Sequence, residues 1–295
     1  MALMNSGIIA ATLAYLLWGL FPLYFRLLQS VPALELVAHR ILWSFLLLIL
    51  VLTIKRQWKS FWDVFHQKRI IFFHLASSIT IASNWLIYVW AINTNRVIES
   101  SMGYFLNPLL TIVLGVIIFK ERLRTIQWIS VGLAAVGISI LSCLHGTIPW
   151  VALSLALSFG LYGLLKKLAP VQTTFGLLLE TSLLILPASG YLIYGVHSDQ
   201  STWILAPART HFLLIGTGLV TIIPLFLFAV AAVRIPLSQL GFLQYLTPTM
   251  QFLLGYFLYH ESFNTARQIS FTCIWIALAL NWIPHKKHNY AQTIE

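Results

Sequence analysis

Long apolar runs recur along the chain, and they leave few folds open to it. Of its 295 residues, 59% are hydrophobic and only 9% are charged, whereas soluble proteins carry about 25% charged residues. A helix of about 20 apolar residues crosses the roughly 30 Å hydrocarbon core of a bilayer. The runs are continuously apolar and longer than the about 9–11 residues of a barrel strand, which favours helices. The sequence therefore predicts an all-α membrane protein with many crossings.

Ten such runs can be placed, five in each half of the chain. The first run has no basic segment before it and exceeds the apolar core of a secretory signal, so we expect it to remain as the first span. The loops are too short for a separate soluble domain. The predicted spans are 7–26, 34–54, 70–92, 98–119, 125–143, 149–165, 173–195, 210–233, 237–259 and 266–284.

The basic residues are distributed unevenly between the two sets of loops. With a cytoplasmic N-terminus, thirteen Lys and Arg residues fall on the inner side and four on the outer side, as expected where positive charge stays in the cytoplasm. The net charge of +10 thus indicates topology and not binding to nucleic acid. Both termini are predicted to be cytoplasmic. The inner residues are Lys55, Arg56, Lys59, Lys68, Arg69, Lys120, Arg122, Arg124, Lys166, Lys167, Arg234, Lys286 and Lys287.

A motif of proline, glycine and glutamate occurs twice with the same internal spacing. Because its copies lie five predicted spans apart, an odd number, they cross the bilayer in opposite directions. Inverted halves around a central site are a recurring plan of secondary transporters. We predict two inverted five-helix repeats, residues 1–145 and 146–295, whose mid-helix prolines allow bending during transport. The copies, 140 positions apart, are Pro108, Gly115, Glu121 and Pro248, Gly255, Glu261.

The order of motifs resembles the drug/metabolite transporter superfamily, within it the EamA-type ten-helix transporters, and most closely the RarD proteins. The resemblance covers essentially the whole chain. It implies inverted five-helix repeats and transport of small organic molecules across the bacterial inner membrane. The motifs that carry it include Trp18-Gly19, His39-Arg40, Asn84-Trp85, Ser101 to Phe105, Asn107-Pro108, Gln244-Tyr245 and Pro248-Thr249.

Four ionisable residues lie within or at the edge of predicted spans: His39, Arg40, Glu99 and Glu180. Such side chains cost about 2.5–3.5 kcal/mol at a helix centre, so they usually face a cavity or a partner. In one interpretation Arg40 anchors an anionic or carbonyl group of the substrate, and His39 or Glu180 takes up a proton. In the other, Arg40 and Glu99 form a structural ion pair and Glu180 reaches toward cytoplasmic water. Both interpretations stay open.

Neutral amides with aromatic neighbours complete the predicted site. Amides can bind a solute, or they can tie helices together for about 0.6–2 kcal/mol. Aromatic walls with a few hydrogen-bonding groups suit an amphipathic solute, which can carry a ring. The residues predicted to contact a solute bound centrally between the two halves are His39, Arg40, Asn84, Trp85, Tyr104, Gln244 and Tyr245.

These features together predict a gradient-driven carrier or facilitator of the bacterial inner membrane. The chain has no phosphate-binding loop, and Cys143 and Cys273 lack ligand-like spacing, so no cofactor or metal is expected. Its expected partners are a small molecule and the lipid bilayer, with the protein a monomer or a homodimer. Glu121 is expected in a structural ion pair at the surface with its basic neighbours Lys120, Arg122 and Arg124. The alternative is an integral membrane enzyme acting on lipid-linked substrates, with His39 as a base.

Overall fold

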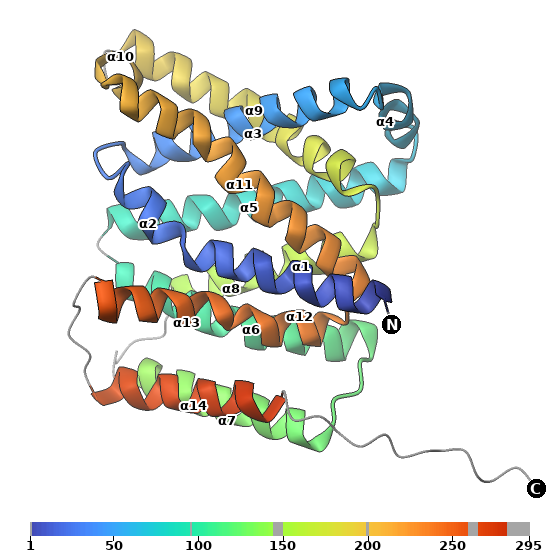
Figure 1. Cartoon of the computed structure of the whole chain (residues 1–295), viewed down its shortest axis with the longest axis vertical. Coiled ribbons are helices and arrows are strands. Elements are labelled where there is room, and N and C mark those ends of the chain that lie inside the picture. Colours follow the sequence, from blue (N-terminus) through green and yellow to red (C-terminus); the bar gives the residue numbers. More distant parts are fainter. Residues whose placement is uncertain (1, 95, 144–149, 199–200, 259–264, 282–295) are drawn as a thin grey trace, which may run out of the picture.

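The computed structural model describes residues 2–94, 96–143, 150–198, 201–258 and 265–281, and its regular elements within these ranges are all helices. Most run side by side (Figure 1). The long ones are α1 (Ala2–Gly19), α3 (Ala33–Ile54), α5 (Lys68–Asn93), α6 (Val97–Phe119), α7 (Thr125–Cys143), α8 (Trp150–Leu168), α9 (Thr173–His197), α11 (Ala208–Arg234) and α14 (Thr265–Asn281). The short ones are α2 (Phe21–Arg26), α4 (Trp58–Phe65), α10 (Thr202–Leu205), α12 (Leu237–Gln244), α13 (Leu246–Leu253) and the π-helical turn η1 (Leu254–Leu258).

The prediction of an all-α membrane protein is confirmed for the described residues. Seven helices there are long and apolar enough to cross a bilayer, and shorter apolar stretches lie within α7 and α14. Large apolar side chains remain on the surface, such as Leu186 at 79% and Phe212 at 75% exposure. Extensive apolar surface of this kind suits a lipid environment. The count of ten crossings stays a prediction.

Two of the predicted spans are interrupted, each close to a proline. The first divides at Leu20, just before Pro22, into α1 and α2. The ninth divides at Tyr245, three residues before Pro248, into α12 and α13. Proline has no N–H and removes the hydrogen bond to the carbonyl four residues earlier. By contrast, α6 continues through Pro108, so the two copies of the motif differ in shape.

The predicted cytoplasmic loop 55–69 contains the helix α4, which was not predicted. In α4, Phe61 and Val64 are buried, whereas Trp62 is 54% and Phe65 43% exposed. Phe61 packs on Phe175 of α9, with ring centroids 5.7 Å apart. A helix with one face on the protein and an apolar edge outside suits the interface of the bilayer.

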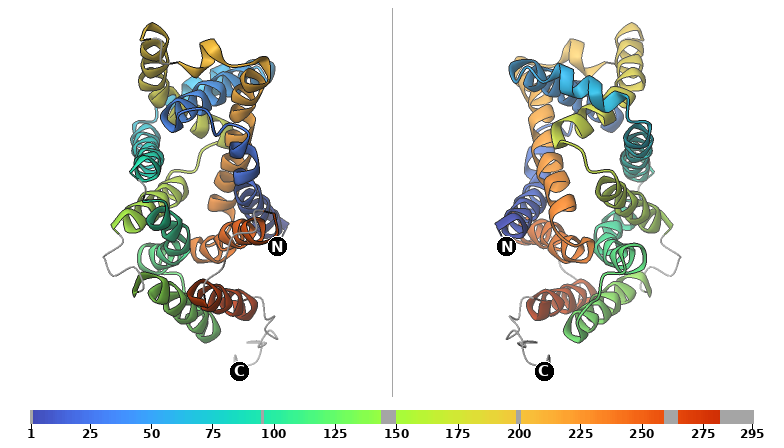
Figure 2. Two further views of the ribbon diagram at one scale, coloured as in Figure 1. Left: turned by 90° about the vertical axis from the view of Figure 1, so that its left-hand side faces the viewer. Right: turned by 90° about the vertical axis from the view of Figure 1, so that its right-hand side faces the viewer.

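The long helices pack in a regular set of pairs. α3 lies on α9, and α7 lies on α14 at the opposite end of the stack (Figure 1). Between them, α6 packs on α8 and α12, while α1 packs on α11 and α13. Figure 2 shows the helices nearly end-on. The start of α1 and the end of α14 lie on the same side of the molecule, together with α4 (Figure 1).

Candidate functional site

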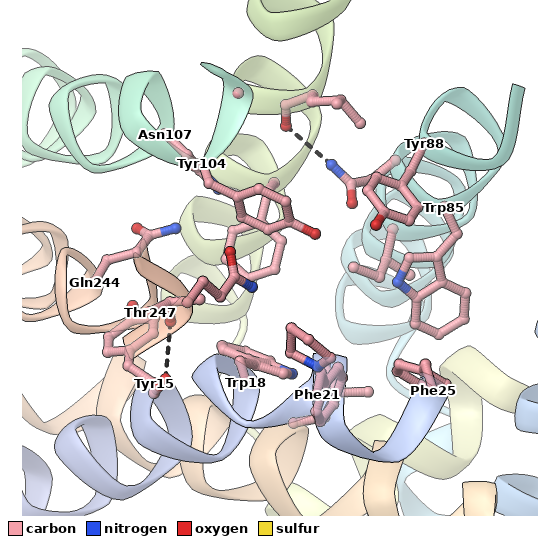
Figure 3. A pocket seen from close by; sticks show the side chains of 18 of the residues that line it. Tyr15, Trp18, Phe21, Phe25, Trp85, Tyr88, Tyr104, Asn107, Gln244 and Thr247 are labelled. Carbon is pink, nitrogen blue, oxygen red and sulfur yellow. Dashed lines mark hydrogen bonds between the residues drawn. The ribbon is translucent and has the colours of Figure 1, made fainter. Parts of the chain in front are cut away.

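A cavity with a volume of about 280 Å³ lies among α1, α2, α5, α6, α8 and the α12–α13 junction. Its wall is mainly aromatic, and Figure 3 shows rings from α1, α2, α5 and α6 converging on it. A wall of this kind suits an apolar or ring-bearing part of a ligand. The aromatic residues are Tyr15, Trp18, Phe21, Phe25, Trp85, Tyr88, Tyr104 and Phe159.

Arg40 brings a positive charge to this aromatic wall. Its Nε donates to Thr221 Oγ1 at 3.0 Å, and its Cζ lies 4.8 Å from the centroid of Trp85 and 5.4 Å from that of Phe25. Rings at these distances stabilise a guanidinium group without neutralising it. Among the described residues no carboxylate forms an ion pair with Arg40. The side chain of Glu99, its predicted alternative partner, lies outside the described residues.

Four amide side chains line the cavity, those of Asn84, Asn107, Gln244 and Gln251, and the first three show which hydrogen-bonding groups they offer. Asn84 Nδ2 donates to the carbonyl of Leu155 at 2.9 Å and to Ser158 Oγ at 3.0 Å, which ties α5 to α8 and leaves the amide oxygen as an acceptor. Asn107 Oδ1 is buried and has no partner among the described residues. Gln244 Oε1 accepts from Thr111 at 3.4 Å, so its nitrogen remains a donor. The cavity thus offers a cation, donors and acceptors within an apolar wall.

Five of the seven predicted contact residues line this one cavity, and two do not. Tyr245 is only 1% exposed and packs in a separate apolar cluster with Phe105 and Phe271. His39 lies next to Arg40 but faces away, because successive residues of a helix are turned by about 100°. The residues that line the cavity are Arg40, Asn84, Trp85, Tyr104 and Gln244.

His39 belongs instead to a cluster under α10. Its imidazole stacks on Trp203, with ring centroids 5.2 Å apart, and its Nε2 lies 3.9 Å from Glu35 Oε1. The Glu35 carboxylate accepts hydrogen bonds from the backbone N–H groups of Thr202 and Trp203 at 3.1 and 3.3 Å. A carboxylate at the start of a helix satisfies free backbone donors. Glu35 therefore holds α10 over α3.

Glu180 does not reach toward water, so that alternative from the sequence is wrong. The residue is 4% exposed, and its Oε1 lies 2.6 Å from Lys166 Nζ and 3.1 Å from His74 Nδ1. Lys166, expected in a cytoplasmic loop, is buried in the last turn of α8. The sequence contained two signals for this cluster, His74 within the third predicted span and Lys166 at the end of the sixth. Only the fold shows that they meet.

Glu121 also differs from its predicted surroundings. Its carboxylate accepts from the backbone N–H groups of Leu237 at 2.7 Å and Ser238 at 2.8 Å. Lys167 Nζ lies 3.8 Å from Glu121 Oε1 and donates to the carbonyl of Ile235. The residue therefore satisfies donors at the start of α12 and joins three helices, which its basic sequence neighbours did not suggest.

Residues 5–143 match the EamA-like transporter family. The chain is 43% identical over 280 residues to "Uncharacterized transporter YojE" of Bacillus subtilis, covering 94% of this chain and 93% of the relative. It is 40% identical over 276 residues to "Protein RarD" of Escherichia coli, with coverage of 94% and 93%. "Chloramphenicol-sensitive protein RarD" of Pseudomonas aeruginosa is 27% identical over 284 residues, with coverage of 95% and 94%. A solved crystal structure shares the fold with a TM-score of 0.71 at 18% identity, covering 94% of this chain and 96% of that one.

Proposed function

Because the chain belongs to the EamA-like transporter family and is 40% identical to a RarD protein over nearly its whole length, we propose that it is a secondary transporter or facilitator. It moves a small organic molecule across the bacterial inner membrane. Family membership favours this function over an enzyme acting on lipid-linked substrates. The polar groups of the cavity also come from several helices and are not gathered at one membrane interface, where such an enzyme would act.

The proposed architecture consists of two inverted five-helix repeats, residues 1–145 and 146–295. The helix packing supports it. The counterparts in the two halves are α1 and α8, α3 and α9, α5 and α11, α6 and α12–α13, and α7 and α14. When each helix of a packed pair is replaced by its counterpart, the result is again a packed pair. The pair α6–α8 then becomes α13–α1, the pair α5–α8 becomes α11–α1, and α5–α9 becomes α11–α3. The pairs α3–α9 and α7–α14 map onto themselves. A two-fold arrangement of this kind lets one repeat rock against the other.

The observation that carries the proposal is that the Arg40 guanidinium group, in an aromatic cavity, has no carboxylate partner among the residues whose side chains the structure describes. Arg40 can pair with a carboxylate or carbonyl group of a substrate, while Trp85 and Tyr104 contact its apolar part. Asn84 and Asn107 supply oxygen acceptors for substrate hydroxyl or amino groups. We therefore propose an amphipathic substrate that carries a ring and a carboxylate or carbonyl group.

We infer that the cavity is closed on its inner side by a block of packed rings: Tyr15, Trp18, Phe159, Tyr162 and Phe228. Trp18 and Phe228 have ring centroids 5.6 Å apart, and Tyr162 stacks on Phe228 at 5.7 Å. Tyr162 and Phe228 are at most 2% exposed, whereas Tyr88 on the other side of the cavity is 37% exposed. With cytoplasmic termini, this arrangement corresponds to a carrier closed toward the cytoplasm.

The test is a comparison of Arg40→Ala with Arg209→Ala, which removes an exposed arginine away from the cavity. Purified protein would first be screened by thermal shift against amino acids, nucleosides, metabolites and amphenicols. Uptake of each hit into proteoliposomes would then be measured. A hydrogen bond to a charged group contributes about 1.5–3 kcal/mol, so Arg40→Ala should lower uptake at least about tenfold. Unchanged uptake would assign Arg40 a structural role.

A further inference from the structure

A second polar centre lies apart from the substrate cavity. We call it the His74 cluster: His74 and Ser77 of α5, Tyr162 and Lys166 of α8, and Glu180 of α9. All five residues are at most 5% exposed. Glu180 lies seven residues after the start of α9, about 10 Å along the helix at 1.5 Å per residue. On α5, the first residue that lines the substrate cavity is Ile81, seven residues beyond His74, which is again about 10 Å away.

The hydrogen bonds of the cluster fix the tautomer of His74. Glu180 Oε1 accepts from Ser77 Oγ at 2.5 Å and lies 2.6 Å from Lys166 Nζ, so the carboxylate is paired as an anion. An ionised carboxylate can only accept hydrogen bonds. His74 Nδ1, at 3.1 Å from the same oxygen, must therefore carry a hydrogen and donate it. The lone pair of the imidazole then resides on Nε2.

His74 Nε2 is buried and has no partner among the described residues. A small cavity of about 10 Å³ lies beside it, which is roughly the space of one water molecule. Its lining includes Lys166 together with Ala169 and Val171 from the α8–α9 connection. The predicted topology places that connection in the cytoplasm. Gly176 makes room for the ring, because a Cβ there would lie 2.6 Å from His74 Cε1.

We propose that His74 is the proton-binding residue of this carrier, which rests on the proposed transport function. A hydronium ion on the cytoplasmic side transfers a proton to the Nε2 lone pair, so that one O–H bond breaks, one N–H bond forms and a neutral water molecule remains. The Lys166–Glu180 pair is neutral overall, so the cluster gains one positive charge. The imidazolium then shares the Glu180 carboxylate with Lys166. Because His74 lies on α5 while its partners lie on α8 and α9, proton binding changes the attraction between the two halves.

Few charged side chains surround His74. Within the part of the chain that the structure describes, the charged and titratable groups of the cluster around it are Glu180, Lys166 and Tyr162. The other residues around the small cavity, Thr173 and Gly176 of α9 and Ala229 and Val233 of α11, carry no charge. A purely structural ion pair would need only Lys166 and Glu180. Burying an imidazole nitrogen without a partner costs stability, which a proton-binding role explains.

The test measures the effect of pH on the cytoplasmic end without any substrate. Spin labels would be attached at Lys68→Cys and Gln172→Cys, both exposed positions at the starts of α5 and α9. The full-length protein would carry Cys143→Ser and Cys273→Ser and be reconstituted in lipid. Distances would be measured by pulsed electron resonance between about pH 5 and 8, where histidine changes charge. We expect a pH-dependent change in distance that His74→Gln abolishes.

The matched control is His39→Gln, which removes another buried histidine and should leave the pH response intact. A second variant, Lys166→Gln with Glu180→Gln, preserves the net charge and should also abolish the response. A parent protein insensitive to pH, or a response that survives in His74→Gln, would overturn the proposal. The spin-label experiment contains no substrate, so its failure would not affect the proposed transport function, which the uptake of Arg40→Ala tests. Failure of the uptake test would likewise leave the measured distances unchanged.

Discussion

For single residues, the sequence predicted where along a span a polar side chain lies, but not which side of the helix it faces. Arg40, Asn84 and Gln244 stand out as polar side chains in apolar spans, and all three line the cavity. His39 stood out equally and faces α10 instead. These helices are apolar on nearly every side, so no hydrophobic stripe indicates which side chains face inward. Likewise, His74 and Glu180 are 106 residues apart, and only their helix packing brings them together.

One glycine controls how closely the Arg40 helix approaches α11. A Cβ at Gly218 would lie 2.7 Å from the backbone carbon of Trp43, and Thr221, which holds Arg40, follows one turn later. Gly218→Ala should therefore separate α3 from α11 and cost about 1–3 kcal/mol of stability. Thermal unfolding in detergent would measure this loss. Gly190→Ala is the control, since nothing lies within 4 Å of its added Cβ. Equal unfolding temperatures for the two variants would contradict the prediction.

Whole helices followed the apolar runs closely. The predicted spans 34–54 and 98–119 correspond to α3 (Ala33–Ile54) and α6 (Val97–Phe119) within one residue at each end. The predicted span 237–259 is instead divided into three pieces. Hydropathy averages over a window, so it finds the crossing but not an interruption within it. The short α4 was not predicted because its charged neighbours lower the local average.

The attachment of α12 to α6 depends on the Glu121 carboxylate. Glu121→Ala would leave the N–H groups of Leu237 and Ser238 without their acceptor and Lys167 without its carboxylate partner. A lost partner of this kind costs about 1–3 kcal/mol. We expect a lower unfolding temperature for Glu121→Ala and a smaller decrease for Glu121→Gln, which keeps one oxygen. Asp63→Ala, at an exposed site of α4, should change nothing. An equally large decrease in the unfolding temperature of Asp63→Ala would refute the role of Glu121 as the acceptor at the start of α12.

For the molecule as a whole, charge distribution and the repeated motif together predicted an arrangement with both ends on one side. The start of α1 and the end of α14 do lie on the same side (Figure 1). The uneven distribution of Lys and Arg residues remains the physical basis for the orientation.

Labelling of introduced cysteines tests that orientation. In a chain carrying Cys143→Ser and Cys273→Ser, an impermeant maleimide should label Arg209→Cys in intact spheroplasts. Lys59→Cys should react only after the membrane is opened, because α4 lies on the side of the termini (Figure 1). Both positions are exposed, so accessibility of the side chain itself is matched. The reverse pattern would place the termini outside the cytoplasm.

The block of packed rings beside the cavity determines how the proposed carrier would respond to ionic strength. Its members come from α1, α8 and α11 and interlock through apolar surfaces, with Phe159 and Phe228 centroids 5.4 Å apart. Rings without net charge hold together almost equally well at low and high ionic strength. In the proposed carrier this block would therefore seal the cavity to the same extent at any salt concentration. A change that opens the proposed carrier would then originate in charged groups outside the block, such as Arg40 or the His74 cluster.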